Sequence, residues 1–301
     1  MKLTTETALS KWFDLDRLAA YLQLTKPGIT VTVLASMLIG FLLASAGSID
    51  YILMLHASLG TWLIASGTAA HNQFLEWRFD SRMKRTRQRP VPASKIAPRE
   101  SAIFSAVLIS AGLIYLILMV NYLAGLISLA TTVIYLGAYT PMKRVSAVNV
   151  LIGAVPGALP PVGGWAAATA TLADPGMWVL FGIVFFWQVP HVMAIAWVCK
   201  DDYRKAGFRM LPKNDENGTK TTALILGCLL ALLPVTWALY AIELGGLVYI
   251  VGGMLCTAAY LGYGILFAVD RTKERAKKLM FASFIYLPLV WIVVFIDQLI
   301  G

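Results

Sequence analysis

Charged residues are scarce in this chain of 301 residues, where Asp, Glu, Lys and Arg together make up 14% of the sequence. A soluble domain carries about 25% charged residues, whereas 58% of this chain is hydrophobic. The shortage excludes a soluble globular domain with an ordinary charged surface. We expect an all-α integral membrane protein with a single membrane domain over 1–301, because the polar segments are too short to build a second domain.

Cysteine and histidine are also scarce, with three residues of each. Cys199, Cys228 and Cys256 stand singly in or beside apolar runs, without a CxxC pair or a Cys/His cluster. This pattern argues against structural zinc and against a disulfide framework. The N-terminus also lacks a short apolar core followed by a small-residue cleavage site, so we expect no signal peptide.

Long apolar runs are what the chain has in abundance. A membrane-spanning helix needs roughly 20 mostly apolar residues, and nine segments of the sequence meet this requirement. They are approximately 29–47, 52–73, 102–120, 122–140, 147–168, 176–198, 221–242, 245–269 and 279–299. Before them, apolar residues at helical spacing over 9–24 predict an amphipathic helix lying on the membrane. We therefore expect a cytoplasmic N-terminal segment over 1–27 and a nine-helix bundle over 28–300.

The basic residues predict the orientation of this bundle. With nine spans, all 25 Lys and Arg residues fall on one side, and the opposite links carry only acids. The positive-inside rule makes the basic side cytoplasmic, so the N-terminus lies in the cytoplasm, the C-terminus lies outside, and the chain crosses the cell (inner) membrane several times. The net charge of +9 then reflects basic loops, and we expect no nucleic-acid partner.

The segment at the end of the second apolar run contains the most closely spaced candidate functional residues. Asn72, Glu76 and Asp80 stand four residues apart, which places them on one helix face with about 5–6 Å between neighbouring Cβ atoms. Such oxygen ligands suit Mg²⁺. Six basic residues follow between Arg78 and Arg89, and they suit phosphate oxygens. The basic residues are also explained as topology signals, and the acids as ion-pair partners of nearby arginines, so both alternatives remain open.

Two further segments repeat this combination of polar groups at the cytoplasmic ends of spans. The sixth run is followed by Asp201, Asp202, Arg204 and Lys205, and the fourth run ends in residues 139–144 with two cations. We expect the acids of both long loops to face each other across one diphosphate through Mg²⁺, as parts of an internal repeat offset by four helices. A solvated charge cluster and a simple topology anchor are the alternatives for these two segments.

Two features lie inside the predicted spans. The Gly- and Pro-rich stretch 153–164 predicts a broken fifth helix that lines a cavity, or a kink that serves packing. His191 in the sixth span is either a buried hydrogen-bonded histidine or a contact to a polar substrate or an iron. We interpret His56 and His71 as structural.

Together these motifs resemble the UbiA superfamily of intramembrane prenyltransferases, whose first motif is Asn-x-x-x-Asp-x-x-x-Asp and whose members have nine helices around a central cavity. The segments that carry the resemblance are 24–27, 80–90, 139–144, 149–161, 190–191 and 202–212. Glu76 departs from the motif, where Asp is usual. Asp201 and Asp202 are adjacent instead of about four residues apart, which puts a second metal site in doubt.

The resemblance is greatest to the branch of the family that transfers a farnesyl group to heme, and it implies the substrates and the site. Farnesyl diphosphate is the implied donor, and the 2-vinyl group of heme b is the implied acceptor. Heme O is the implied product, for terminal oxidases or for a downstream heme A synthase. Mg²⁺ is the implied cofactor, with Asn72, Glu76, Asp80 and Asp202 as ligands and Arg85 as a further catalytic residue. The implied substrate-binding residues are Lys26, Arg89, Tyr139, Lys143, Arg144, His191, Tyr203, Arg204 and Lys205. Phe74, Trp77 and Tyr203 are the aromatic candidates for stabilising an allylic cation.

Two other functions remain as alternatives. A related enzyme would keep the same chemistry and take a quinone precursor or another aromatic acceptor. A transporter or channel would use its acids as an ion pathway, which should place them near the middle of the bilayer. Here the acids lie at the ends of the predicted spans, which favours the prenyltransferase.

Overall fold

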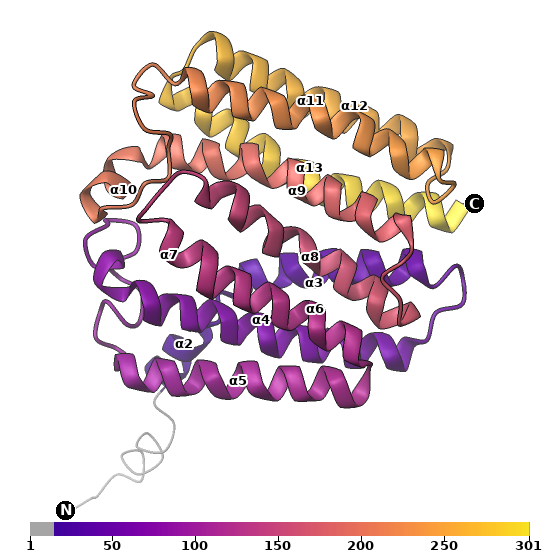
Figure 1. The fold of residues 1–301 in the computed structure, drawn as a ribbon, viewed down its shortest axis with the longest axis horizontal. Helices are drawn as coiled ribbons and strands as arrows, with labels where there is room; N and C mark the ends of the chain where they lie inside the picture. The colour runs from indigo at the N-terminus through magenta and orange to yellow at the C-terminus, as the bar shows by residue number, and fades with distance from the viewer. Residues whose placement is uncertain (1–14, 301) are drawn as a thin grey trace, which may run out of the picture.

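The computed structural model describes residues 15–300, and within that range the regular structure is helical (Figure 1). The first part of the chain forms α2 (Leu15–Leu24), α3 (Pro27–Ala44), α4 (Tyr51–Asp80), α5 (Pro98–Met119), α6 (Tyr122–Val133), the π-helix η1 (Ile134–Tyr139) and α7 (Thr140–Met142). The second part forms α8 (Asn149–Thr169), α9 (Pro175–Val198), α10 (Lys200–Ala206), α11 (Thr219–Ala241), α12 (Leu247–Val269) and α13 (Lys273–Ile300).

The prediction of nine spans is confirmed for the described part of the chain, since nine of its segments are long and apolar enough to cross a membrane. Two of them differ from the expected runs. The second span continues as α4 to Asp80 instead of ending near residue 73. The fourth runs from Tyr122 to Met142 and changes from α6 through η1 to α7 on the way. Both differences concern the end of the bundle where the predicted site lies.

The long helices lie side by side, with their connections at the two ends (Figure 1). α8 is the most buried of the nine spans, and glycine allows its close contact with α3. A Cβ added at Gly40 would lie 2.0 Å from the Pro161 carbonyl oxygen, and one at Gly164 would lie 1.8 Å from that of Met37. The expected break in this helix is wrong, because α8 runs without interruption past Pro156, Pro160 and Pro161. The glycines and prolines here serve packing between helices.

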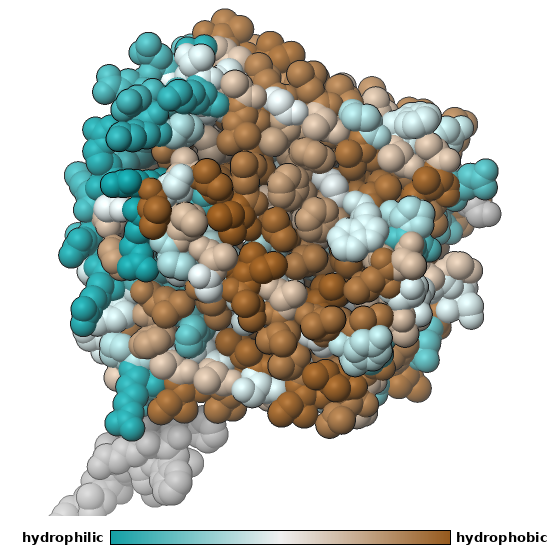
Figure 2. Space-filling view, in the orientation of Figure 1, coloured by the Kyte–Doolittle hydropathy of each residue, from teal (hydrophilic) through white to brown (hydrophobic). Residues whose placement is uncertain are grey.

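The surface has the distribution expected of a chain in a bilayer. Apolar side chains cover the middle of the bundle, and hydrophilic ones gather at the end that carries α10 and the longest loops (Figure 2). Residues 9–14 of the predicted amphipathic helix lie outside the described part. In α2 itself, Leu15, Leu18 and Leu22 are exposed while Leu24 is buried, as in a helix that lies in the membrane interface. The division of the domain at residue 27 stays a prediction.

Candidate functional site

The last two turns of α4 bring the three predicted metal ligands onto one face. Asp50 begins the helix by accepting hydrogen bonds from the backbone N–H groups of Ile52 and Leu53. No proline lies between Asp50 and Asp80. Asn72, Glu76 and Asp80 are all buried, with 1%, 5% and 1% exposure. The helical spacing predicted from the sequence is therefore present, and this face points into the protein.

Each of these side chains contacts a cation from a different segment. Lys26 Nζ donates to Asn72 Oδ1 at 2.9 Å. Lys143 Nζ donates to both Glu76 oxygens, at 2.9 and 3.1 Å, and Arg89 Nη1 donates to Asp80 Oδ2 at 2.7 Å. Because burying a charge without a partner is costly, these contacts explain how two carboxylates remain inside the helix bundle.

The cations are themselves held in unusual surroundings. Lys26 adopts φ 48° as the residue before α3, a left-handed conformation that is uncommon for a residue other than glycine. Burial, followed by repulsion from Arg89 and Lys143, lowers the pKa of Lys26 to about 7. Burial also opposes the charged form of Lys143, but the neighbouring Tyr139 and Glu76 together raise the pKa of this lysine. The three cations thus concentrate positive charge around the row on α4.

The π-helix η1 supplies contacts that the sequence did not reveal. Thr140 Oγ1 donates to the Tyr135 carbonyl at 2.8 Å and accepts from Asn72 Nδ2 at 3.2 Å, which fixes the orientation of the Asn72 amide. The rings of Tyr135 and Tyr139 lie 5.2 Å apart, and Lys143 Nζ lies 4.4 Å from the centre of the Tyr139 ring. π-Helical turns are frequent at functional sites, but no residue pattern in 134–139 predicts such a turn.

The loop after α9 meets this site through aromatic residues and backbone contacts. Arg85 Nη2 donates to Tyr203 Oη at 3.2 Å, and the rings of Phe79 and Phe208 lie 5.5 Å apart. Arg144 lies over the Phe79 ring, 5.0 Å from its centre. The two loops therefore meet, and aromatic side chains form much of the contact, while the expected facing of their acids across a diphosphate stays a prediction.

The charged residues of α10 do not join the row on α4. Within residues 15–300, Asp202 accepts no hydrogen bond and forms no ion pair. Arg204 and Lys205 are exposed. Of the predicted site residues in this helix, only Tyr203 contacts another predicted site residue in the described part. The assignments of Asp202, Arg204 and Lys205 stay predictions.

The aromatic residues Phe74 and Trp77, proposed from the sequence, pack away from the row on α4. Trp77 packs against the buried cluster beneath α2 and α5, and Phe74 packs against His71. Both therefore lie on other faces of α4 than the row of three. Phe79, Tyr135 and Tyr139 are rings that lie close to the charged groups, and the assignment of Phe74 and Trp77 to the reaction centre stays a prediction.

The three histidines all use Nδ1 to contact a hydroxyl group. His56 contacts Tyr115 Oη at 2.7 Å and His71 contacts Ser105 Oγ at 2.8 Å, both on α5. These contacts support a structural role for both. His191 on α9 contacts Ser283 Oγ on α13 at 2.6 Å.

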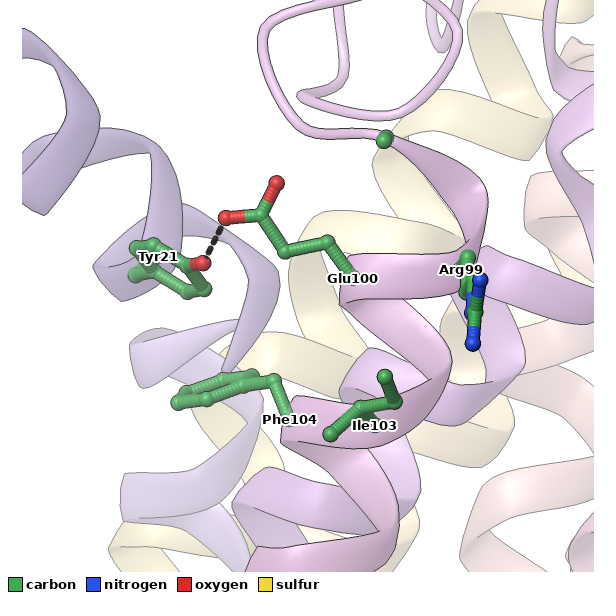
Figure 3. Close-up of a pocket in the computed structure, with 6 residues that line it drawn as sticks. Tyr21, Arg99, Glu100, Ile103 and Phe104 are labelled. Carbon is green, nitrogen blue, oxygen red and sulfur yellow. Dashed lines mark hydrogen bonds between the residues drawn. The ribbon is translucent and has the colours of Figure 1, made fainter.

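A hollow between α2 and the start of α5 lies apart from these residues (Figure 3). Its lining consists of Tyr21, Ala97, Arg99, Glu100, Ile103 and Phe104. The Tyr21 hydroxyl points at the Glu100 carboxylate, which it hydrogen-bonds, and Arg17 contacts the same carboxylate at 2.5 Å. None of the predicted site residues lines this hollow.

The row on α4 fits a magnesium ion that is coordinated by protein oxygens and by the phosphate oxygens of a ligand. Asn72, Glu76 and Asp80 present oxygen atoms, which Mg²⁺ prefers, and Mg²⁺ commonly binds one or two carboxylates together with substrate phosphates. Within the described residues no group of three His, Cys, Asp or Glu side chains forms a complete metal cage. Phosphate oxygens from a ligand would complete the coordination, and the three surrounding cations would bind the same ligand.

Comparisons with known proteins agree with this fold. The model of the UbiA prenyltransferase family matches residues 33–287. A protoheme IX farnesyltransferase of Solibacter usitatus is 40% identical over 287 residues, which cover 92% of this chain and 98% of that protein. One of Opitutus terrae is 40% identical over 305 residues, with 98% of both chains covered.

Solved structures share the arrangement of helices at low sequence identity. A digeranylgeranylglyceryl phosphate synthase has a TM-score of 0.80 at 18% identity and covers 95% of this chain and 100% of its own. A UbiA homolog from Archaeoglobus fulgidus bound to GPP and Mg²⁺ has a TM-score of 0.65 at 14% identity, with 91% of this chain and 99% of its own covered. The family model and the two relatives at 40% identity show that this chain belongs to the UbiA prenyltransferase family.

Proposed function

We propose that this chain is a protoheme IX farnesyltransferase, which transfers a farnesyl group from farnesyl diphosphate to the 2-vinyl group of heme b and yields heme O. The observation that carries the acceptor is the 40% identity, over nearly the whole of both chains, to proteins of this name. The buried row of Asn72, Glu76 and Asp80 with its three cations supports the diphosphate half of the reaction independently.

The α4 row is the place where Mg²⁺ would bind. Asn72, Glu76 and Asp80 would hold the ion, with Asp202 as a predicted ligand from the opposite loop. When bound, Mg²⁺ neutralises the diphosphate and makes it a better leaving group. Lys26, Arg89 and Lys143, which contact the row in this structure, would bind the phosphate oxygens of the same ligand.

The outer cations extend this positive surface toward the cytoplasmic loops. Arg85 and Tyr203 form one hydrogen-bonded pair at the rim, and Arg144 lies over Phe79 beside it. Arg204 and Lys205 on the exposed side of α10 would attract the diphosphate as it approaches. These residues supply charge for binding and release, and none of them acts as a covalent nucleophile.

The reaction needs a site that excludes water while the carbon–oxygen bond of farnesyl diphosphate breaks. The bonding electron pair leaves with the diphosphate, and the vinyl carbon of heme forms the new bond to the allylic carbon. Water then adds to the resulting cation and releases a proton. The rings of Tyr135 and Tyr139 stand beside Lys143, where their faces would stabilise positive charge on the allylic carbon.

The membrane setting follows from the charge distribution. The site lies at the end of the bundle that carries the basic loops, where hydrophilic side chains gather on the surface (Figure 2). The positive-inside rule assigns this end to the cytoplasm. The N-terminus would then be cytoplasmic and the C-terminus external, in the cell (inner) membrane. Heme O would pass to a terminal oxidase or to a downstream heme A synthase.

The experiment is a reconstitution with defined substrates. The purified chain in lipid nanodiscs receives farnesyl diphosphate, heme b and Mg²⁺, and the pigments are extracted and separated by hydrophobicity. A more hydrophobic heme with the mass of the hydroxyethylfarnesyl product is expected. Unchanged heme, together with prenylation of a quinone precursor in the parallel reaction, would overturn the proposed acceptor.

A further inference from the structure

Ser283 contacts His191 in a way that favours one tautomer of the imidazole ring. Ser283 Oγ lies 2.5 Å from the Met280 carbonyl oxygen and 2.6 Å from His191 Nδ1. A hydroxyl has a single hydrogen, and a carbonyl oxygen only accepts. With the hydrogen of Ser283 on the Met280 carbonyl, the Ser283 oxygen accepts from His191. His191 then carries its proton on Nδ1, and Nε2 keeps an open lone pair.

The same helix fixes the plane of the imidazole ring. The Trp187 ring stacks on His191 with a centroid distance of 5.2 Å and an interplanar angle of 18°. Trp187 is held in turn by its Nε1–H, which donates to the Ser283 carbonyl at 2.8 Å. Phe284 meets the imidazole edge-on, with centroids 4.9 Å apart. The orientation of the ring is thus fixed by neighbours on α9 and α13.

The position of His191 connects it to the diphosphate site. It lies about 10 Å along the axis from the end of α9 at Val198. One turn away, Gln188 Nε2 lies 3.4 Å from the Gly153 carbonyl of α8. A Cβ added at Gly153 would lie 2.6 Å from the Tyr139 ring, which adjoins Lys143. A short series of contacts therefore leads from the predicted metal ligands to His191.

A neutral imidazole with its Nδ1–H engaged and Nε2 open is the arrangement that metal-binding histidines adopt. We propose that His191 Nε2 is an axial ligand to the iron of the heme substrate, and that Ser283 is the positioning residue that keeps this nitrogen free. The inference rests on the proposed function for the identity of the acceptor. Axial ligation would hold the porphyrin by its iron while leaving the vinyl group at its edge free to react.

His71 offers a matched comparison inside the same protein. Its Nδ1 contacts Ser105 Oγ at 2.8 Å, and Ser105 donates to the Ala102 carbonyl at 2.9 Å. The hydrogen-bond pattern is the same, but this pair lies between α4 and α5, at the edge of the bundle (Figure 1). Ser105→Ala is therefore the control for losing a buried serine–histidine bond away from the proposed heme position.

The test measures binding of ferric heme and of iron-free protoporphyrin IX to the purified protein. Ser283→Ala should weaken heme binding by about tenfold or more, the effect of losing a partner that orients a metal ligand, and should alter the heme absorption spectrum. Ser283→Thr, which keeps the hydroxyl, should behave as the original protein. Ser105→Ala should leave both unchanged, and binding of the iron-free porphyrin should be unchanged in all three variants.

Chemical rescue separates ligation from packing. His191→Gly should lose the spectrum of the imidazole-bound heme, and added imidazole should restore it. An equal loss of affinity for heme and for the iron-free porphyrin in Ser283→Ala, or a spectrum indifferent to His191, would overturn the inference. If the wild-type protein farnesylates heme but its heme spectrum does not depend on His191, the proposed function holds and axial ligation by His191 is contradicted. If it shows the His191-dependent spectrum without farnesyl transfer, heme ligation stands and the proposed reaction fails.

Discussion

The end of α4 and the helix α10 look alike in sequence and differ in structure. Both place acids and bases at the end of an apolar run. On α4 the acids are buried, and each has a cation within hydrogen-bonding distance. On α10 the side chain of Asp201 is exposed, and so are those of Arg204 and Lys205. On this comparison we propose that the α4 row would hold the metal, while α10 would act mainly through Tyr203 and through its charge.

The difference arises from what surrounds each helix. α4 is long enough to continue past the apolar zone while still packed between α2, α6 and η1. α10 is a separate helix of 7 residues beyond the end of α9, and most of its surface meets water. Burial strengthens electrostatic interactions because the local dielectric constant is low. Substitutions in the two segments should therefore have very different effects.

The largest expected effect is that of Asp80→Ala. Removing this carboxylate takes away a predicted magnesium ligand and leaves the Arg89 guanidinium without its partner. We expect kcat for farnesyl transfer to fall by about 10²–10³-fold, the usual cost of losing one group that stabilises developing charge. Activity is measured in nanodiscs, and the intact circular dichroism spectrum serves as the control for folding. Activity within twofold of wild type would show that α4 is not the metal site.

Lys143→Met should reduce both stability and activity. It leaves Glu76 as a buried charge without a partner, which costs about 3–5 kcal/mol in the free energy of unfolding. The double variant Glu76→Gln/Lys143→Met removes both charges and should recover much of that stability while remaining inactive. Thermal unfolding of the two variants in the same detergent provides the measurement. Equal stability of the single variant and the wild type would contradict a buried ion pair at this position.

Tyr203→Phe should have a moderate effect confined to substrate binding. It removes the hydroxyl that accepts from Arg85, and a hydrogen bond of this kind contributes about 0.5–1.5 kcal/mol. We expect KM for farnesyl diphosphate to rise about two- to tenfold with kcat nearly unchanged. Steady-state kinetics at fixed heme concentration separates the two constants, and a fall in kcat alone would contradict a role at the rim.

Lys205→Ala should have the smallest effect. The side chain is exposed on α10, and charges exposed to solvent are screened over about 8–10 Å at physiological salt. We expect less than about a twofold loss of kcat/KM at physiological salt and a larger loss at low salt. The matched measurement at two ionic strengths reports on long-range attraction, and a large loss that is independent of salt would instead indicate direct contact with the diphosphate.

Local sequence patterns predicted the spans and the α4 row well. The spacing of Asn72, Glu76 and Asp80 follows helical geometry, and α4 retains that geometry to its last residue. The pairing of Glu76 with Lys143 could not be predicted from local patterns, because it joins residues 67 positions apart through tertiary packing. Lys26 and Arg89 were named as substrate contacts, but their individual partners depend on the same packing.

The remaining differences between sequence and structure have identifiable physical causes. Phe74 and Trp77 were assigned to the reaction centre by proximity in sequence, yet which face of α4 meets α5 is decided by tertiary contacts. The η1 turn has no sequence signal, because it depends on a backbone hydrogen bond from the Thr140 N–H to the Tyr135 carbonyl. The proline-rich stretch of α8 predicted a break, but burial against α3 keeps that helix continuous.

The most direct test compares the magnesium dependence of two aspartate variants. Asp80→Asn and Asp202→Asn are assayed in nanodiscs with saturating farnesyl diphosphate and heme, and the half-saturating Mg²⁺ concentration is determined for each. The account predicts a rise of at least about tenfold for Asp80→Asn, which corresponds to about 1.4 kcal/mol, and a rise below about threefold for Asp202→Asn. A larger shift for Asp202→Asn than for Asp80→Asn would contradict the assignment of the metal to α4.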